Sequence, residues 1–167
     1  MKKIIIVIFL MMVTAVFINE KEHILIPDDA IRFRVIANSD SKYDQKLKLE
    51  IKEEVEQELY KLIRNAKNSN EVRKIITKNI SEVDNILNKY NIEYDISYGD
   101  NYFPAKEYKG IEYSEGNYES LVITVGKGLG KNWWCVLFPP LCLLDEQRNL
   151  DNIEYEMYAK KIINKFQ

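Results

Sequence analysis

Histidine and cysteine are scarce in this chain of 167 residues, which contains only His23, Cys135 and Cys142. A structural zinc site needs four ligands, and these three residues cannot supply them. A catalytic Cys–His pair would depend on the same histidine, which lies close to the N-terminal apolar segment. Metal binding and cysteine-based catalysis are therefore disfavoured.

Common hydrolase motifs are also missing. The sequence has no Gly-x-Ser-x-Gly turn, no His-Glu-x-x-His pair and no Asp-Thr/Ser-Gly triplet of an aspartic protease half-site. Carboxylate pairs such as Asp40 with Asp44 fit helix capping better than acid–base chemistry. We therefore expect a protein that is not an enzyme.

Glycine is infrequent, but three of the six glycines fall within residues 126–130. A phosphate-binding loop would need glycine at Val125 and a hydroxyl residue at Asn132. A dinucleotide-binding turn starting at Gly126 would need glycine at Lys131 and a following helix. The spacing thus predicts a flexible connection between two strands, with a small anionic ligand as the minor alternative, and no cofactor.

The chain has no excess of basic residues, because 24 Lys and Arg are set against 26 Asp and Glu, for a net charge of -2. It also lacks a basic stripe with interleaved aromatic residues, so nucleic acid is not an expected partner. Hydrophobic residues make up 46% and charged residues 30%, which is typical of a globular domain. No repeat or long linker divides the chain.

The one long apolar run is at the N-terminus. Lys2 and Lys3 precede fifteen residues from Ile4 to Ile18, all apolar except Thr14, which as a helix would span roughly 22 Å against a hydrocarbon core of roughly 30 Å. Residues 1–19 are therefore expected to be a signal peptide or signal anchor, followed by a polar spacer at 20–30. Ala15 is the only small apolar candidate for a cleavage motif, so both outcomes stay open.

Hydrophobic periodicity predicts an α+β order for the rest of the chain. Strands are expected at 31–37, 92–98, 118–125 and 133–138, with an irregular hairpin at 103–113. Helices are expected at 44–66, at 70–90 with a break near 79–81, and at 152–166. Short turns between the late strands favour a mainly antiparallel sheet with two or three helices packed on one face. The predicted domain covers 31–145, with a C-terminal helical tail at 146–167.

Both tryptophans lie in one apolar run that ends at two prolines. Neighbouring residues of a strand point to opposite faces, which separates Trp133 from Trp134 and places Phe138 on the face of Trp134. Exposed aromatic residues beside a proline turn are typical of binding hot spots. The alternative is that both faces are covered. The candidate partner-binding residues are Trp133, Trp134, Phe138, Pro139, Pro140 and Leu141.

Cys135 and Cys142 flank the proline pair. An oxidising compartment would permit a disulfide between them, provided that a turn at Pro139-Pro140 brings the two Cα atoms within bonding range. The alternative is two buried thiols in an apolar setting.

Two segments resemble the stage II sporulation protein R family. One is residues 132–142, Asn-Trp-Trp-Cys-Val-Leu-Phe-Pro-Pro-Leu-Cys, and the other is residues 31–41, Ile-Arg-Phe-Arg-Val-Ile-Ala-Asn-Ser-Asp-Ser. Asp44-Gln45, Phe103-Pro104 and Tyr118-Glu119 match in order between them. The resemblance extends over about residues 26–145.

This resemblance implies a signalling protein of endospore-forming bacteria that is exported from the forespore into the space between the two membranes. Its expected partner is a membrane-embedded aspartic protease of the mother cell, which cleaves the precursor of sigma-E. The protein would then be an activator of the protease, with contact to the membrane only through an uncleaved leader.

The matching segment at residues 31–41 and the start of the next helix form a candidate second contact surface. Its residues are Arg32, Arg34, Asn38, Asp40 and Asp44, of which the two arginines could equally form a solvated strand face. The alternative functions are an extracytoplasmic cell-wall-acting enzyme, working through Asp40, Asp44 or Glu119, and a structural envelope module.

Overall fold

A computed structural model describes residues 26–108, 111–142 and 152–166. The strands are β1 (Ile31–Ile36), β2 (Tyr94–Phe103), β3 (Lys106–Tyr108), β4 (Ile111–Tyr113), β5 (Gly116–Val125) and β6 (Asn132–Phe138). The helices are α2 (Lys42–Ile63), α3 (Ser69–Lys78), α4 (Ile80–Asn88) and α6 (Asn152–Phe166). The predicted α+β class and the order of elements are confirmed.

The main sheet has four strands in the order β2-β5-β1-β6. β2 pairs with β5 and β1 pairs with β6 in antiparallel fashion, whereas β1 and β5 are parallel. The late strands β5 and β6 are therefore not partners, although the short turn between them favoured direct pairing. β1 lies between them, and the loop at 126–131 carries the chain around the end of β1.

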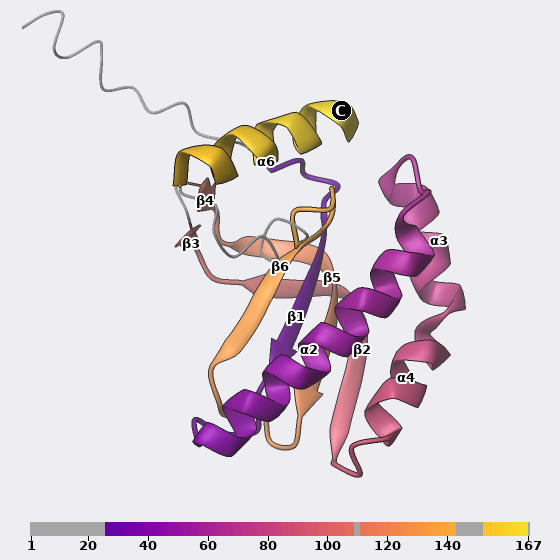
Figure 1. The fold of residues 1–167 in the computed structure, drawn as a ribbon, viewed down its shortest axis with the longest axis vertical. Coiled ribbons are helices and arrows are strands. Elements are labelled where there is room, and N and C mark those ends of the chain that lie inside the picture. The colour runs from indigo at the N-terminus through magenta and orange to yellow at the C-terminus, as the bar shows by residue number, and fades with distance from the viewer. Residues whose placement is uncertain (1–25, 109–110, 143–151, 167) are drawn as a thin grey trace, which may run out of the picture.

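Helices α2, α3 and α4 cover one face of this sheet (Figure 1). Each helix presents an apolar stripe, which in α2 consists of Leu47, Ile51, Val55, Leu59 and Ile63. These residues pack with one set of alternating strand residues, including Phe33, Val35, Leu121 and Ile123. The packing of helices on one face is thus confirmed for α2, α3 and α4.

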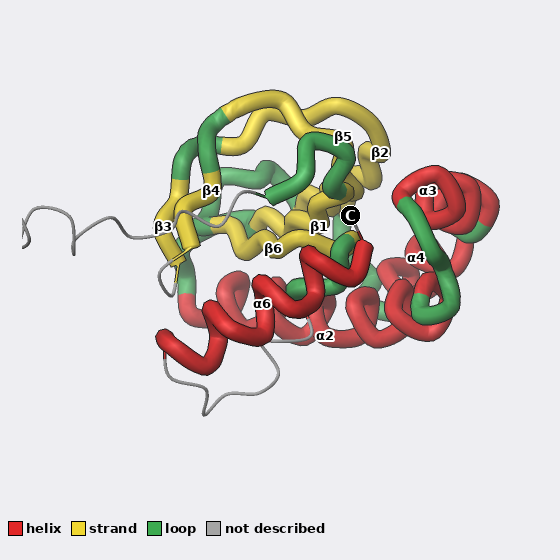
Figure 2. Tube along the Cα trace, turned by 90° about the horizontal axis from the view of Figure 1, so that it is seen from above, coloured by secondary structure: helices red, strands yellow, loops and turns green. Residues whose placement is uncertain are grey.

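The opposite face of the sheet is also covered. Figure 2 shows β2 and β5 curling over the sheet toward the small β3–β4 sheet. A second core cluster fills the space between the curled strands and the sheet. Its buried members include Phe103, Tyr113, Trp134, Val136 and Leu141. α6 lies across one end of the sheet (Figure 1) and adds Ala159 and Ile163 to the cluster.

Helix boundaries follow local polar signals. The Ser41 side chain accepts a hydrogen bond of 3.1 Å from the Asp44 backbone N–H and so caps the start of α2. The predicted break in the next helical region is present at Asn79, between α3 and α4. No helix in the described ranges combines the length and apolarity needed to cross a bilayer. The predicted leader at 1–19 lies outside the described residues.

Candidate functional site

The Cys135–Cys142 disulfide closes the end of β6. Its two Cα atoms are 5.4 Å apart, and both cysteines are buried. The chain turns back at Pro139 and Pro140, as predicted, and the Phe138–Pro139 peptide bond is cis. Of the two states that the sequence left open, a disulfide or two buried thiols, the structure has the disulfide.

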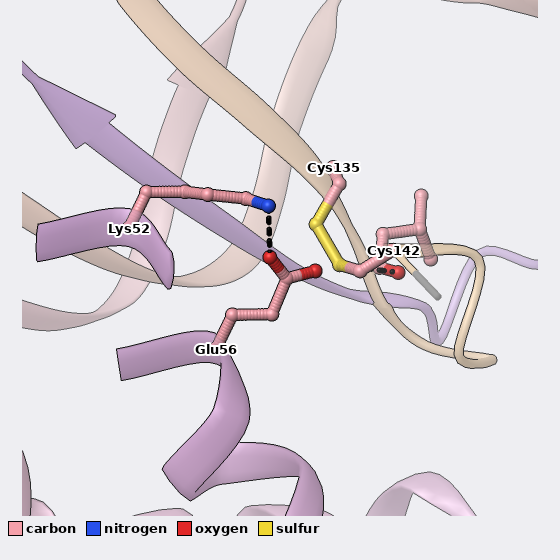
Figure 3. Close-up of a disulfide and its surroundings, with 5 residues drawn as sticks. Lys52, Glu56, Cys135 and Cys142 are labelled. Carbon is pink, nitrogen blue, oxygen red and sulfur yellow. Dashed lines mark hydrogen bonds and ion pairs between the residues drawn. A yellow bond between two sulfur atoms is a disulfide. The ribbon is translucent and has the colours of Figure 1, made fainter. Parts of the chain in front are cut away.

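An ion pair from α2 lies beside the disulfide, between the ammonium of Lys52 and the carboxylate of Glu56 (Figure 3). Glu56 is buried, and the Lys52 Nζ atom lies 4.7 Å from the centroid of the Trp133 ring. The Glu56 carboxylate and the two sulfur atoms lie within 4.8 Å of one another. Because both sulfurs are in the disulfide, neither is a thiolate able to ligate a metal.

Trp133 and Trp134 point to opposite faces of β6, as the strand period predicts. Trp133 is half-buried on the helix side, where its ring packs edge-on against Phe33 at 5.8 Å between centroids. Trp134 is 5% exposed, and its ring meets Phe103 at 5.3 Å and Tyr113 at 5.2 Å in T-shaped contacts. Trp134 is thus a core residue of the second cluster.

Phe138 does not share the face of Trp134, which corrects the expectation from strict alternation. The register between β1 and β6 shifts after Arg32, so that Ile31 lies opposite Phe138 while Arg32 lies opposite Val136. The extra residue is Leu137, and such a bulge reverses the facing of the residues that follow. Phe138 therefore packs in the helix-side core, with its ring 4.8 Å from that of Phe166.

Most of the predicted partner-binding segment is interior. Trp134 and Phe138 are each 5% exposed, Leu141 is 1% exposed, and Pro139 is also buried. These side chains cannot contact a partner directly in this conformation. Trp133 and Pro140 are half-buried and keep accessible surface. A binding role for the segment stays a prediction, now limited to these two side chains and their surroundings.

Arg32 is buried beneath three aromatic rings, which corrects the expectation of a solvated or contact surface at this position. Its side chain is 1% exposed, and the guanidinium carbon lies 3.3 Å from the Tyr118 ring centroid. The rings of Trp134 and Phe103 flank it at 5.0 and 5.1 Å. Within the described part of the chain, Nε and Nη1 have no hydrogen-bond partner. Burial lowers the pKa of the guanidinium, while the aromatic faces attract the cation.

Arg34 is half-buried and well hydrogen-bonded. Its Nη1 donates to the Tyr102 carbonyl at 3.2 Å. With the Asn132 amide turned so that its oxygen faces the guanidinium, Arg34 Nη2 also donates to that oxygen at 2.6 Å. Burial lowers the pKa of this arginine too. Arg34 therefore ties β1 to the curled end of β2 as well as to β6.

Asn38 and Asp44 form a polar junction at the end of β1. The Asp44 carboxylate accepts hydrogen bonds from the Ser39 hydroxyl and, at 3.1 Å, from the Asn38 amide. These bonds, that from Ser39 first, lower the pKa of Asp44. The Asn38 side-chain oxygen in turn accepts from the Lys127 backbone N–H at 3.0 Å.

The same junction holds the glycine loop. Asp40 accepts a hydrogen bond of 2.7 Å from the Lys131 backbone N–H, and the buried Lys48 ammonium donates to the Lys131 carbonyl at 3.0 Å. A Cβ atom at Gly126 would overlap the Asn38 side chain, and one at Gly130 would overlap the Ser39 backbone. The loop is therefore a close-packed strand connection, whose glycines permit approach to the end of β1.

The Glu119 carboxylate also accepts hydrogen bonds that join parts of the fold. Arg73 of α3 donates to its carboxylate through Nε at 2.8 Å and Nη2 at 2.5 Å, and the Tyr98 hydroxyl donates at 2.6 Å. The Arg73 hydrogen bonds lower the pKa of Glu119, and burial raises that of Tyr98. The carboxylates considered for a cell-wall-acting enzyme, Asp40, Asp44 and Glu119, all accept structural hydrogen bonds.

A surface pocket beside Pro140 was not anticipated from the sequence. It has a volume of about 210 Å³ between the ends of α2 and α6, and Phe138 and Pro140 form part of its lining. Arg64 and Lys165 also line it, and both are exposed. The sequence carries no signal of this pocket, because it depends on how the end of α6 packs against the end of α2.

Comparison with known proteins agrees with the two matching segments. A family model described as Stage II sporulation protein R matches residues 27–148. The Stage II sporulation protein R of Bacillus subtilis (strain 168) is 39% identical over 133 residues, which is 76% of this chain and 59% of the relative's length. No solved structure matches. The family is named as a sporulation protein and not as a protease or other enzyme, and this chain belongs to the stage II sporulation protein R family.

Proposed function

We propose that this protein is an extracytoplasmic signal of sporulation. It is exported from the forespore and activates a membrane-embedded aspartic protease of the mother cell, which then processes the precursor of sigma-E. Membership of the stage II sporulation protein R family carries this proposal. The apolar run at residues 4–18 supports export, and the disulfide fits an oxidising compartment.

Activation requires a ligand that binds one arrangement of the protease better than another. The region around the proline turn is suited to such binding, because the buried Trp134 and Phe138 and the disulfide hold it in one shape. The half-buried Trp133 and Pro140 lie at its accessible edge. The core residues would then act by positioning the surface, and the contacts themselves would come from the surrounding exposed side chains.

The test is co-expression of the full chain with the protease and the precursor in a host that does not sporulate. We expect processed sigma-E to appear only when all three proteins are present. Unprocessed precursor in the presence of a folded, exported chain would contradict the proposal. Alanine at Trp134 or Phe138 is a poor probe here, because removing a buried aromatic ring costs about 3–5 kcal/mol of stability.

The enzyme alternative can be examined in the same host. Asp40→Asn and Glu119→Gln keep the shapes of the side chains and remove their charges. Processing that survives in both variants would argue against a catalytic role for these carboxylates. Loss of processing in a variant with unchanged thermal stability would favour it.

A further inference from the structure

We propose that the pocket beside Pro140 binds an acidic segment of the protease and accommodates one of its apolar side chains. This inference rests on the proposed function and specifies the chemistry of the contact.

The pocket has an apolar floor and partly accessible walls. Ile63, Ala66 and Phe138 are buried at its base, with exposed fractions of 3%, 8% and 5%. Its walls include Tyr60, which is 38% exposed, and the half-buried Pro140, Ile162 and Phe166. An apolar side chain entering this space would leave water and gain contacts on several sides.

The size of the pocket favours a side chain over a cofactor. Its volume of about 210 Å³ is below the roughly 300–1,000 Å³ of small-molecule sites. It equals the volume of about seven liquid waters, which is enough for one large aliphatic or aromatic side chain. Such a site provides an anchor within a larger protein contact and does not suit a nucleotide or flavin.

The charge at the rim selects an acidic occupant. Arg64 follows the last turn of α2, Lys165 lies in the last turn of α6, and both side chains line the pocket. Among the described residues, no carboxylate forms an ion pair with either of them, whereas the nearby Lys61 is paired with Glu58 at 3.1 Å. Lys67 and Lys161 are exposed on the same two segments. A carboxylate of the occupant would meet two cations that have no acidic partner in the described structure.

The recessed position of the apolar groups favours a protein segment over a lipid surface. A flat bilayer would contact the exposed lysines first, while the floor made by Phe138 and Ala66 stays out of reach behind the walls. A projecting side chain can reach this floor. Charge and shape together therefore indicate a peptide with an apolar residue next to Asp or Glu.

The direct test uses a displayed library of random seven-residue peptides, selected on the full chain purified in detergent. We expect enrichment of peptides that place Asp or Glu within two residues of a large apolar residue. Binding of an enriched peptide, measured by fluorescence anisotropy, should weaken with rising salt. Failure to enrich any peptide, or enrichment without acidic residues, would overturn the inference.

Charge reversal supplies the matched comparison. Arg64→Glu with Lys165→Glu should weaken binding of the enriched peptide at least tenfold. Lys42→Glu with Lys46→Glu makes the same change in net charge at the opposite end of α2, roughly 30 Å away, and should leave binding within twofold. Tyr60→Ala, which removes a partly exposed wall, should also weaken binding. Equal binding of the peptide by the pocket variant and the control variant would show that the pocket is not the peptide-binding site.

The co-expression assay separates this inference from the proposed function. If the wild-type chain triggers processing and the Arg64→Glu/Lys165→Glu variant does so equally, the function stands and the pocket is not the contact. If the wild-type chain triggers no processing, the proposed function is wrong, and the peptide measurement still shows whether the pocket binds acidic peptides. If that variant loses binding to phosphatidylglycerol vesicles and no acidic peptide is enriched, the basic rim recognises lipid and the inference is wrong.

Discussion

The backbone N–H of Lys131 donates a hydrogen bond of 2.7 Å to the carboxylate of Asp40, 91 residues earlier in the chain. The carbonyl of Lys131 accepts from the Lys48 ammonium at 3.0 Å. The glycine loop is thereby bound through its Lys131 N–H to the segment after β1 and through its Lys131 carbonyl to α2. The glycine loop and the segment from Asp40 to Lys48 form one hydrogen-bonded unit, so damage to either should disturb both.

Gly130→Ala should destabilise the protein through this junction. The added Cβ would overlap the carbonyl group of Ser39, and overpacking of this kind costs about 1–3 kcal/mol. Urea denaturation should show the lower free energy of unfolding. Lys127→Ala is the matched control, because its exposed side chain lies in the same loop and only its backbone N–H is used. Equal stability of the two variants would show that the loop can move away from β1.

The disulfide should contribute measurably to stability. In the chain-entropy model, closing the short loop between Cys135 and Cys142 stabilises the fold by about 2.5 kcal/mol. Dithiothreitol should therefore lower the free energy of unfolding of the wild-type chain by about that amount. A Cys135→Ala/Cys142→Ala variant should be insensitive to the reagent. If reduction leaves the wild-type denaturation curve unchanged, the bond has no stabilising effect.

Arg32→Met should preserve or increase stability. Among the described residues, Nε and Nη1 of the buried guanidinium find no hydrogen-bond partner, a cost that the aromatic contacts offset only in part. An apolar side chain of similar length removes the cost of burying this cation with part of its hydrogen-bonding capacity unused. Arg34→Met is the control and should lose about 1 kcal/mol, since Arg34 does form hydrogen bonds. A large loss of stability in Arg32→Met would mean that the packing of the aromatic rings around Arg32 depends on the cation.

Acid should weaken the fold through Asp44 and Glu119. The folded-state pKa of each lies below its ordinary value, 3.8 for Asp44 and 4.5 for Glu119, because hydrogen bonds favour the ionised forms. Their contribution is fully present above these ordinary values and is lost as pH falls through the lower folded-state values. Urea denaturation from pH 7 to pH 2 should show this decline.

Asp44→Asn and Glu119→Gln test the assignment of that decline. Each variant lacks one titrating group, so its stability should depend less on pH in this range than that of the wild type. An Asp100→Asn variant, at an exposed position of β2, serves as the control and should follow the wild-type curve. A decline that is unaltered in both variants would assign the acid sensitivity to other groups.

Sequence periodicity predicted the local elements because each depends on nearby residues. The apolar spacing of α2, the alternation in β1 and the proline turn before Cys142 are visible in the chain itself. The opposite facing of Trp133 and Trp134 followed from the same local geometry, whereas the sequence permitted the disulfide without deciding between it and two buried thiols. Phe138 was assigned to the wrong face because a bulge depends on the partner strand, whose register the sequence does not reveal.

By itself, the sequence determined the element order and the family resemblance, since these depend on local pattern and residue identity. Only the tertiary structure decided which polar residues are buried. Strand alternation allowed a solvated face for Arg32, but the curl of β2 and β5 places Phe103 and Tyr118 over its guanidinium. Likewise, the pocket at Pro140 requires the ends of α2 and α6 to meet. Such packing brings together segments that are far apart in the chain, and no local pattern in either segment indicates that they will be in contact.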